Sequence, residues 1–135
     1  MKVFVDTSSL LAVLDADDLN HTSAKTLWES LLGGGTDLVT HNYVLVETSA
    51  LVLRRLGLDA LRIFERDIAP VFRVVWVTQD VHEAAVGAHL LAARRALSLV
   101  DCVSFEVMRR AGLRSAFAFD PHFAEFGYEL LPIRP

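Results

Sequence analysis

Short apolar runs alternate with longer stretches in which apolar residues recur at helical spacing, along almost the whole chain. The short runs predict strands at residues 2–5, 38–40, 73–77, 115–119 and 128–131. The longer stretches predict helices at residues 7–14, 21–32, 42–56, 58–67, 80–96 and 98–111, with a helical turn at 122–126. Strands that alternate with helices pair in parallel through right-handed crossovers. The pattern therefore predicts one α/β domain with a central parallel sheet of about five strands, flanked by helices on both faces.

Two of the predicted strands run directly into an aspartate. Asp6 follows the first strand, and Asp120 follows the fourth. A helix is expected to begin right after Asp6, capped by Thr7 or Ser8. In an open α/β sheet, ligands bind at the carboxyl ends of the strands, where the strand order reverses. If the first and fourth strands are neighbours, Asp6 and Asp120 meet at that edge.

Two further acids lie in predicted helices. Glu47 stands in a strongly apolar helix, so its carboxylate is expected to be partly buried and to need a cation, an arginine or a metal ion. Asp101 lies near the start of another helix. If the four acids converge, two carboxylates about 4 Å apart repel by roughly 4 kcal/mol at an effective dielectric constant near 20. Hard oxygen ligands favour Mg²⁺ or Mn²⁺, which can activate water for phosphodiester hydrolysis.

Each acid also has a purely structural interpretation. Asp6 can cap a helix, Asp101 can interact favourably with a helix dipole, and Asp120 before a proline is typical of a turn. Glu47 can pair with the arginines near the end of its helix, although that spacing fits a contact along one helix face poorly. The combination of strand ends with helical acids favours a metal site over four separate structural roles.

The composition narrows the class of protein. The 135 residues are 53% hydrophobic and 22% charged, which favours a folded core over disorder. No apolar run reaches the roughly 18–20 residues that a membrane span needs, and the chain opens on a strand where a signal peptide would stand. The single cysteine, Cys102, rules out an internal disulfide and is expected in the core. We therefore expect a soluble cytoplasmic protein that has no membrane partner.

The net charge and the arginine content point to different kinds of partner. A net charge of −4 argues mildly against a general nucleic-acid binder. However, eleven of the thirteen basic residues are arginines, and three pairs are adjacent: Arg54–Arg55, Arg94–Arg95 and Arg109–Arg110. Such pairs suit bidentate phosphate contacts, but a solvated helix face is the better explanation of any single pair.

Several segments resemble the motifs of the PIN domain, in particular the VapC-type toxin branch of the prokaryotic PIN ribonucleases. Val3–Leu11 resembles the first acidic motif of the family, and Glu47 stands where the family carries its helical acid. Ser98–Phe105 and Ala116–Phe123 resemble the third and fourth motifs, and Tyr128–Pro132 matches the usual closing strand. The likeness covers essentially the whole chain.

This resemblance implies a single PIN-like ribonuclease domain over residues 1–135. It implies an endoribonuclease that depends on Mg²⁺ or Mn²⁺ and hydrolyses the phosphodiester bonds of RNA. It also implies the toxin of a type II toxin–antitoxin pair, with a homodimer and an inhibitory protein antitoxin as partners.

The resemblance also ranks the candidate site residues. By carry-over, the principal metal ligands are Asp6 and Asp101. The other two acids, Glu47 and Asp120, complete the catalytic pocket directly or through water. The residues expected to support Asp6 or a bound water are the two hydroxyl residues that follow it, Thr7 and Ser8.

Other enzyme classes fit the sequence less well. A phosphatase of the haloacid dehalogenase type requires a second aspartate two residues after the first, where this chain has Ser8. A receiver domain requires a late lysine, and both lysines, Lys2 and Lys25, are early. The remaining alternative is a non-catalytic PIN-like scaffold that binds RNA or protein.

The histidines and tryptophans are expected to have structural roles. His41 and His122 flank the proposed site in sequence but lack metal-ligand spacing, so we assign them to polar or packing roles. Trp28 and Trp76 are expected in the core.

Overall fold

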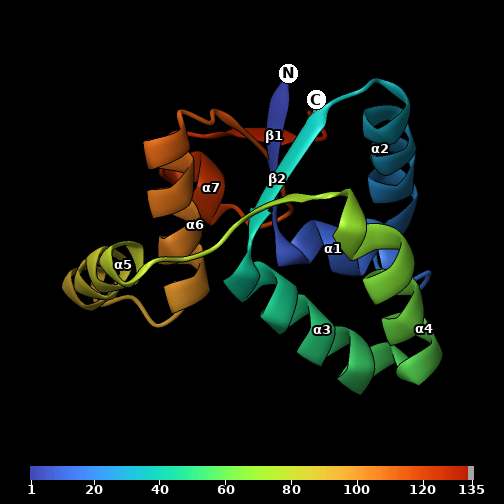
Figure 1. Ribbon diagram of the computed structural model, residues 1–135, viewed down its shortest axis with the longest axis horizontal. Coiled ribbons are helices and arrows are strands. Elements are labelled where there is room, and N and C mark those ends of the chain that lie inside the picture. Colours follow the sequence, from blue (N-terminus) through green and yellow to red (C-terminus); the bar gives the residue numbers. More distant parts are fainter. Residues whose placement is uncertain (134–135) are drawn as a thin grey trace.

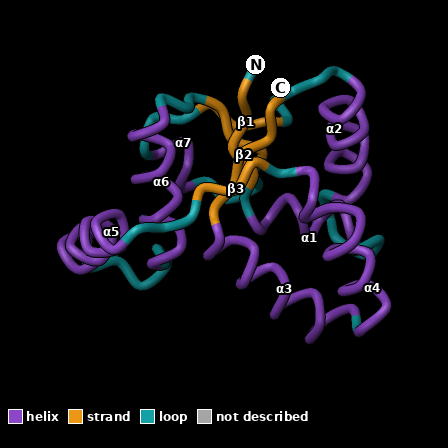
Figure 2. The backbone as a smooth tube through the Cα atoms, in the orientation of Figure 1, coloured by secondary structure: helices purple, strands orange, loops and turns teal. Residues whose placement is uncertain are grey.

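A parallel sheet of five strands lies between helices in the computed structural model, which describes residues 1–133 (Figures 1 and 2). The strands are β1 (Lys2–Val5), β2 (Asp37–His41), β3 (Arg73–Val75), β4 (Ser115–Phe117) and β5 (Glu129–Leu131). The helices are α1 (Thr7–Leu14), α2 (His21–Gly33), α3 (Asn42–Leu56), α4 (Leu58–Ile63), α5 (Gln79–Ala92), α6 (Leu99–Ala111) and α7 (His122–Glu125). The predicted α/β class with five parallel strands is confirmed.

The strand order is β3-β2-β1-β4-β5, so β1 lies at the centre with β4 as a neighbour. The parallel register pairs Phe4 with Ala116 and Val5 with Phe117. The chain moves outward from β1 to β2 and β3, and the connection through α5 and α6 returns to the other side of β1. The strand order therefore reverses between β1 and β4. Their carboxyl ends share one edge of the sheet, as the sequence predicted.

Helices cover both faces of this sheet. In Figure 1, α5, α6 and α7 lie to the left of the strands, α1, α2 and α4 lie to the right, and α3 continues from the end of β2. Helix α5 packs against α6, and α1 contacts both α2 and α3. Because β1 has strands on both sides and helices on both faces, Val3, Phe4 and Val5 are fully buried.

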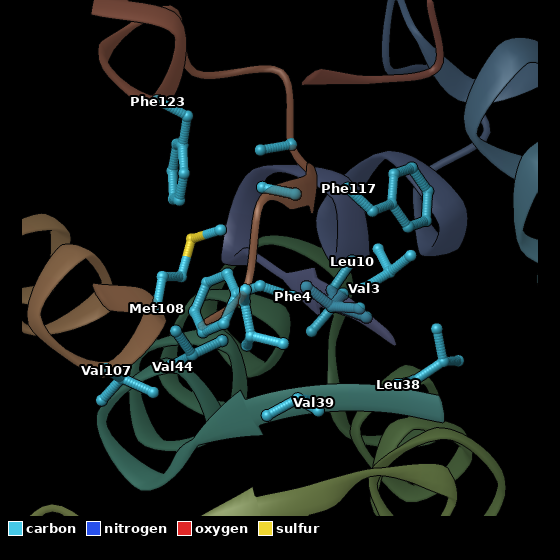
Figure 3. Close-up of a cluster of buried hydrophobic side chains, with 14 of the residues drawn as sticks. Val3, Phe4, Leu10, Leu38, Val39, Val44, Val107, Met108, Phe117 and Phe123 are labelled. Carbon is cyan, nitrogen blue, oxygen red and sulfur yellow. The ribbon is translucent and has the colours of Figure 1, made fainter. Parts of the chain in front are cut away.

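The core next to the acidic edge is built around the ring of Phe4. Figure 3 shows Phe4 of β1 with side chains from α3, α6 and α7 gathered around it, among them Val44, Met108 and Phe123. These side chains are fully buried, and the rings of Phe4 and Phe123 lie 6.0 Å apart. Burial of a side chain of this size stabilises the fold by roughly 1.5–3 kcal/mol. The packing fixes α6 and α7 against the central strand.

Three predicted strands are shorter than expected. The strand predicted at residues 115–119 ends at Phe117, and the one predicted at 128–131 begins at Glu129. The strand predicted at residues 73–77 ends at Val75, and the Trp76 side chain is 71% exposed. The prediction that Trp76 belongs to the core is therefore wrong, because the residue has already left the sheet. Trp28 is buried as expected and packs against Phe72 at a ring distance of 5.9 Å.

Helix boundaries also differ in two places. The helix predicted from Asp80 is capped by Thr78, whose hydroxyl accepts a hydrogen bond from the Val81 N–H, and it ends at Ala92. The helix predicted at residues 58–67 divides into α4, a π-helical turn (Phe64–Ile68) and a 3₁₀ turn (Ala69–Val71). Proline at position 70 accounts for this irregular end. Among residues 1–133, no helix has the length and apolar character required to span a bilayer.

Candidate metal centre

Asp6 lies where β1 ends and α1 begins. Its backbone N–H donates to the Phe117 carbonyl at 3.0 Å, so the chain leaves the sheet beside β4. Asp6 is itself the N-cap of α1, which corrects the predicted cap at Thr7 or Ser8. Asp6 Oδ2 accepts hydrogen bonds from the Ser8 N–H at 3.2 Å and from the Ser8 hydroxyl at 2.6 Å. These two bonds hold the carboxylate at the carboxyl edge of the sheet.

Ser8 also joins Asp6 to the loop after β4, which carries Asp120. The Phe119 N–H donates to Ser8 Oγ at 3.0 Å. One residue later, Asp120 Oδ1 accepts a hydrogen bond from the His122 N–H at 2.9 Å, which closes an Asx turn. The turn interpretation of Asp120 is therefore correct, and the turn lies at the same sheet edge as Asp6.

Asp101 is fixed at the start of α6 by a reciprocal capping box. The Asp101 N–H donates to Ser98 Oγ at 3.0 Å, and the Ser98 N–H donates to Asp101 Oδ2 at 3.0 Å. An exposed first-turn aspartate was the structural interpretation of this residue, but Asp101 is only 8% exposed. The box leaves Asp101 Oδ1 free of any hydrogen bond within the part of the chain that the structure describes.

Three side chains converge at this edge. Asp101, Asp120 and His122 each offer one ligand atom, and these atoms lie within 4.8 Å of one another. His122 Nδ1 lies 2.8 Å from Asp120 Oδ1 and 3.9 Å from Asp101 Oδ2. Among residues 1–133, Asp6 and Glu47 are not members of this group of three.

The electrostatics link Asp6 to the same centre. Burial raises the pKa of Asp6 from 3.8 to about 7, partly offset by the bonds from Ser8, and the charges of Asp101 and Asp120 raise it further. Burial is also the main cause that raises the pKa of Asp101, the bond from Ser98 opposes it, and the charge of Asp120 adds to the rise. The three aspartates are thus close enough to repel one another in a poorly solvated place.

Glu47 reaches this region from α3. Its side chain is half-buried and lines a cavity of about 380 Å³ together with Val100, the residue before Asp101. Within residues 1–133 it forms no ion pair with Arg54 or Arg55, so the poor spacing correctly argued against that pairing.

Thr7 has a different contact from Ser8. Thr7 Oγ1 accepts a hydrogen bond from the Thr48 hydroxyl at 3.1 Å, and both residues are buried. Because Thr48 follows Glu47, this bond fixes the part of α3 that carries Glu47 relative to the part of α1 that follows Asp6.

The donor set fits a divalent cation. Carboxylate oxygens suit Mg²⁺ or Mn²⁺, and an imidazole nitrogen is a common ligand of transition metals. His122 Nδ1 is closed to solvent and has no hydrogen-bond partner of acceptable geometry among the described residues. A cation among these groups would neutralise the mutual repulsion of the acids and give that nitrogen a partner.

Two supporting residues were missed in the sequence. Ser98 stands three residues before Asp101, which is the spacing of a capping box, so this signal was present in the chain. His122 gave no such signal, because its contact with Asp101 depends on how the loop after β4 returns to α6. His41 has the polar structural role that we expected: it is fully buried, and its Nε2 lies 2.8 Å from Ser104 Oγ.

Comparisons with known proteins give one family. The PIN domain model matches residues 3–128. The 23S rRNA-specific endonuclease VapC20 of Mycobacterium tuberculosis, from strains CDC 1551 / Oshkosh and ATCC 25618 / H37Rv, is 38% identical over 134 residues, which cover 98% of both chains.

Solved structures give the same result. The crystal structure of Mycobacterium tuberculosis VapC20, described as a toxin that cleaves the sarcin–ricin loop, has a TM-score of 0.83 and 38% identity over 98% of this chain and 99% of that one. FitAcB from Neisseria gonorrhoeae has a TM-score of 0.69 over 96% of both chains. At 14% identity, its likeness is one of fold alone.

Proposed function

This chain belongs to the PIN domain family, and from that premise we propose that it is a metal-dependent endoribonuclease that acts as the toxin of a toxin–antitoxin pair. We assign the activity to one domain over residues 1–135. The observation that carries the proposal is the convergence of Asp101 and Asp120 beside Asp6, at the edge where the strand order reverses. The 38% identity to an RNA endonuclease over nearly its whole length supports it.

The acidic residues would hold the metal. We assign Asp101, Asp120 and Asp6 to the ion, with Glu47 completing the pocket directly or through water. Mg²⁺ or Mn²⁺ is the ion that carboxylate oxygens favour. When bound, it supplies charge neutralisation at the phosphodiester and lowers the pKa of a bound water.

The chain's own contribution is to keep these groups in place. Ser98 fixes the carboxylate of Asp101 through the capping box, and Ser8 fixes that of Asp6 while it ties the loop of Asp120 to α1. Thr7 acts indirectly, because its hydrogen bond with Thr48 fixes the part of α3 that carries Glu47. Side chains that are held in this way lose little freedom when the ion and the RNA bind.

We propose that the RNA substrate is the sarcin–ricin loop of 23S rRNA, because VapC20 is named for that substrate and matches this chain over nearly its full length. The cavity beside Glu47 is lined by Val46, Val100, Asn42 and the ring of Tyr43. An unstacked base next to the cleaved bond fits such a surface, because base recognition in RNA loops relies on stacking.

We also propose two protein partners, a second copy of the chain and an antitoxin. Apolar side chains that stand exposed on α3 and at the end of α5, among them Val46, Leu53, Leu90 and Leu91, support a protein contact. Light scattering of the purified protein is expected to give twice the mass of one chain. A monomer at micromolar concentration would contradict the homodimer.

The function is tested by incubating the purified protein with 23S rRNA and with a short sarcin–ricin loop RNA. We expect one major cut in the loop with Mn²⁺ or Mg²⁺, and no cut after chelation. Asp6→Asn should abolish cutting, whereas Asp59→Asn, at an exposed aspartate on α4, should not. Binding of the RNA without any cleavage under all metal conditions would favour the non-catalytic scaffold.

A further inference from the structure

We propose that His122 supplies a further ligand atom, Nδ1, to the metal centre of Asp6, Asp101 and Asp120, and that this nitrogen makes the centre prefer Mn²⁺ over Mg²⁺. The inference rests on the proposed metal-dependent function. It adds a ligand that the pattern of four acids does not contain.

The imidazole of His122 lies close to both carboxylates. His122 is the first residue of α7, and its Nδ1 lies 2.8 Å from Asp120 Oδ1 and 3.9 Å from Asp101 Oδ2. Its side chain is only 12% exposed. Two neighbouring contacts fix it: the His122 N–H donates to Asp120 Oδ1, and the next residue, Phe123, is buried against Phe4 and Phe105.

This nitrogen lies within ion-pair distance of both carboxylates but has no hydrogen-bond partner among the described residues. Nδ1 is closed to solvent, and despite the short distance to Asp120 no acceptable hydrogen bond forms among residues 1–133. As a donor, Nδ1 has no aligned acceptor, and as an acceptor it faces carboxylates that carry no proton when ionised. A buried polar atom that is left without a hydrogen bond destabilises the fold. A cation between the imidazole and the two carboxylates removes this destabilisation.

The spacing of the three atoms agrees with shared coordination. Ligand atoms about 2.1 Å from an octahedral ion lie about 3 Å apart when they are adjacent. The distance of 2.8 Å between His122 Nδ1 and Asp120 Oδ1 matches that value, and the 3.9 Å to Asp101 Oδ2 lies between the adjacent and opposite positions. The three groups therefore need little movement to share one ion.

The nitrogen also gives the site a preference among ions. Mg²⁺ favours oxygen ligands and retains its waters, whereas imidazole binds the transition metals readily. A centre of carboxylates and one imidazole is therefore expected to bind Mn²⁺ more tightly than a centre of carboxylates alone, with a smaller effect on Mg²⁺.

Pulsed electron paramagnetic resonance of the Mn²⁺-loaded protein, without RNA, tests the ligand directly. We expect nitrogen hyperfine coupling from a bound imidazole, which changes frequency when the protein is made with ¹⁵N-histidine and disappears in His122→Asn. A wild-type protein that binds Mn²⁺ but shows no histidine coupling overturns the proposal. This measurement needs only the wild-type protein, so it decides the question even if the variant is unstable.

Calorimetric titration of both ions tests the preference. His122→Asn keeps an oxygen near the place of Nδ1, so we expect Mn²⁺ affinity to fall by roughly 10- to 100-fold and Mg²⁺ affinity to fall less. His21→Asn is the matched control, because His21 is also a partly buried first residue of a helix. Unchanged affinity, or an equal loss for both ions, overturns the preference.

The same experiments separate this inference from the proposed function. Wild-type protein that binds Mn²⁺ and cuts RNA without histidine coupling overturns the role of His122 and leaves the nuclease intact. Wild-type protein that binds neither ion overturns both.

Discussion

The groups around Asp6 shift its pKa in opposite directions. The hydroxyl and N–H of Ser8 stabilise the ionised form, whereas burial and the charges of Asp101 and Asp120 destabilise it. Burial prevails and raises the pKa to about 7. At pH 8 in the absence of metal, Asp6 is therefore ionised. A pKa shift of this size lowers the free energy of unfolding by roughly 4 kcal/mol or less.

The first prediction concerns this loss of stability. Asp6→Asn removes the charge but keeps an N-cap that can accept from the Ser8 N–H, so the metal-free variant should be about 1–3 kcal/mol more stable than wild type at pH 8. Because the folded pKa is raised, wild type regains this stability as the pH falls below 7, and the difference should shrink towards pH 5. Urea unfolding with a chelator measures it, and a variant less stable than wild type at pH 8 would refute the argument.

His41 behaves in the opposite way. Its Nδ1 accepts from the Val44 N–H at 3.3 Å, and its Nε2 lies 2.8 Å from Ser104 Oγ, which in turn donates to the Val100 carbonyl. Burial lowers the pKa of His41 from 6.5 to about 3. The folded protein therefore keeps this imidazole neutral.

The second prediction follows from that lowered pKa. In the unfolded chain, a histidine takes up a proton below pH 6.5, so the contribution of His41 to stability is complete above that pH and is lost as the pH falls towards 3. His41→Asn should be less stable at pH 7 but should lose about 1–3 kcal/mol less than wild type between pH 7 and 4.5. Parallel loss in both proteins, measured by urea unfolding, would show that His41 is not the titrating group.

At the scale of elements, Phe105 connects α6 with α7 and with the residues that lead into β5. Its ring lies 5.0 Å from that of Phe123 and 4.5 Å from that of Phe126, and its carbonyl accepts from the Tyr128 hydroxyl at 3.2 Å. Helix α6 carries Asp101 and α7 begins at His122. This aromatic contact therefore sets the distance between two members of the metal centre.

The third prediction tests that contact. Phe105→Ala should destabilise the protein by about 3–5 kcal/mol, because it leaves a cavity between α6 and α7. Phe126→Ala, at a neighbouring residue that is 47% exposed, should cost about 1 kcal/mol or less. Chemical unfolding of both variants gives the comparison, and equal costs would show that the ring of Phe105 does not hold the helices.

Some boundaries of the helices and strands could be predicted from the sequence, and others could not. Helix α3 was predicted with its observed ends, Asn42 and Leu56, because Gly57 stops a long apolar pattern. The end of β3 was predicted two residues too late. Trp76 has a high strand propensity, and only the neighbouring strand decides where pairing stops. The prediction extended α5 past Ala93. The left-handed backbone of Ala93 is set by its surroundings and not by the conformational preference of alanine.

At the scale of the whole molecule, the metal is expected to act as a stabilising ligand. The acids come from the ends of β1 and β4 and from the start of α6, so an ion bound between them links parts that are far apart in the chain. A ligand that binds only the folded state stabilises it by about 2.7 kcal/mol at 100 times its dissociation constant.

The fourth prediction follows from this linkage. Saturating Mn²⁺ should raise the melting temperature of wild type by roughly 5–10 °C. The shift should vanish in Asp101→Asn and remain in Asp59→Asn, whose aspartate is exposed on α4. Differential scanning calorimetry measures it, and an equal shift in Asp101→Asn would place the ion elsewhere.

The site itself was only partly accessible from the sequence. Asp6 and Asp120 follow strands, so their meeting place came from topology, which local patterns predict well. Glu47 and Asp101 were placed by resemblance, and the chain alone did not indicate how near each would come. His122 entered the centre through a three-dimensional contact between the start of α7 and the start of α6, which no spacing along the chain reports.

The most direct measurement is the single-turnover rate of cleavage of a sarcin–ricin loop RNA at saturating Mn²⁺, compared between wild type and Asp101→Asn. Asp101 is buried, fixed by Ser98 and next to Asp120, so its carboxylate is the group that the proposed activity needs most. We expect the rate to fall by about 100-fold or more while the protein stays folded. Cleavage by Asp101→Asn at the wild-type rate would contradict the metal-dependent nuclease.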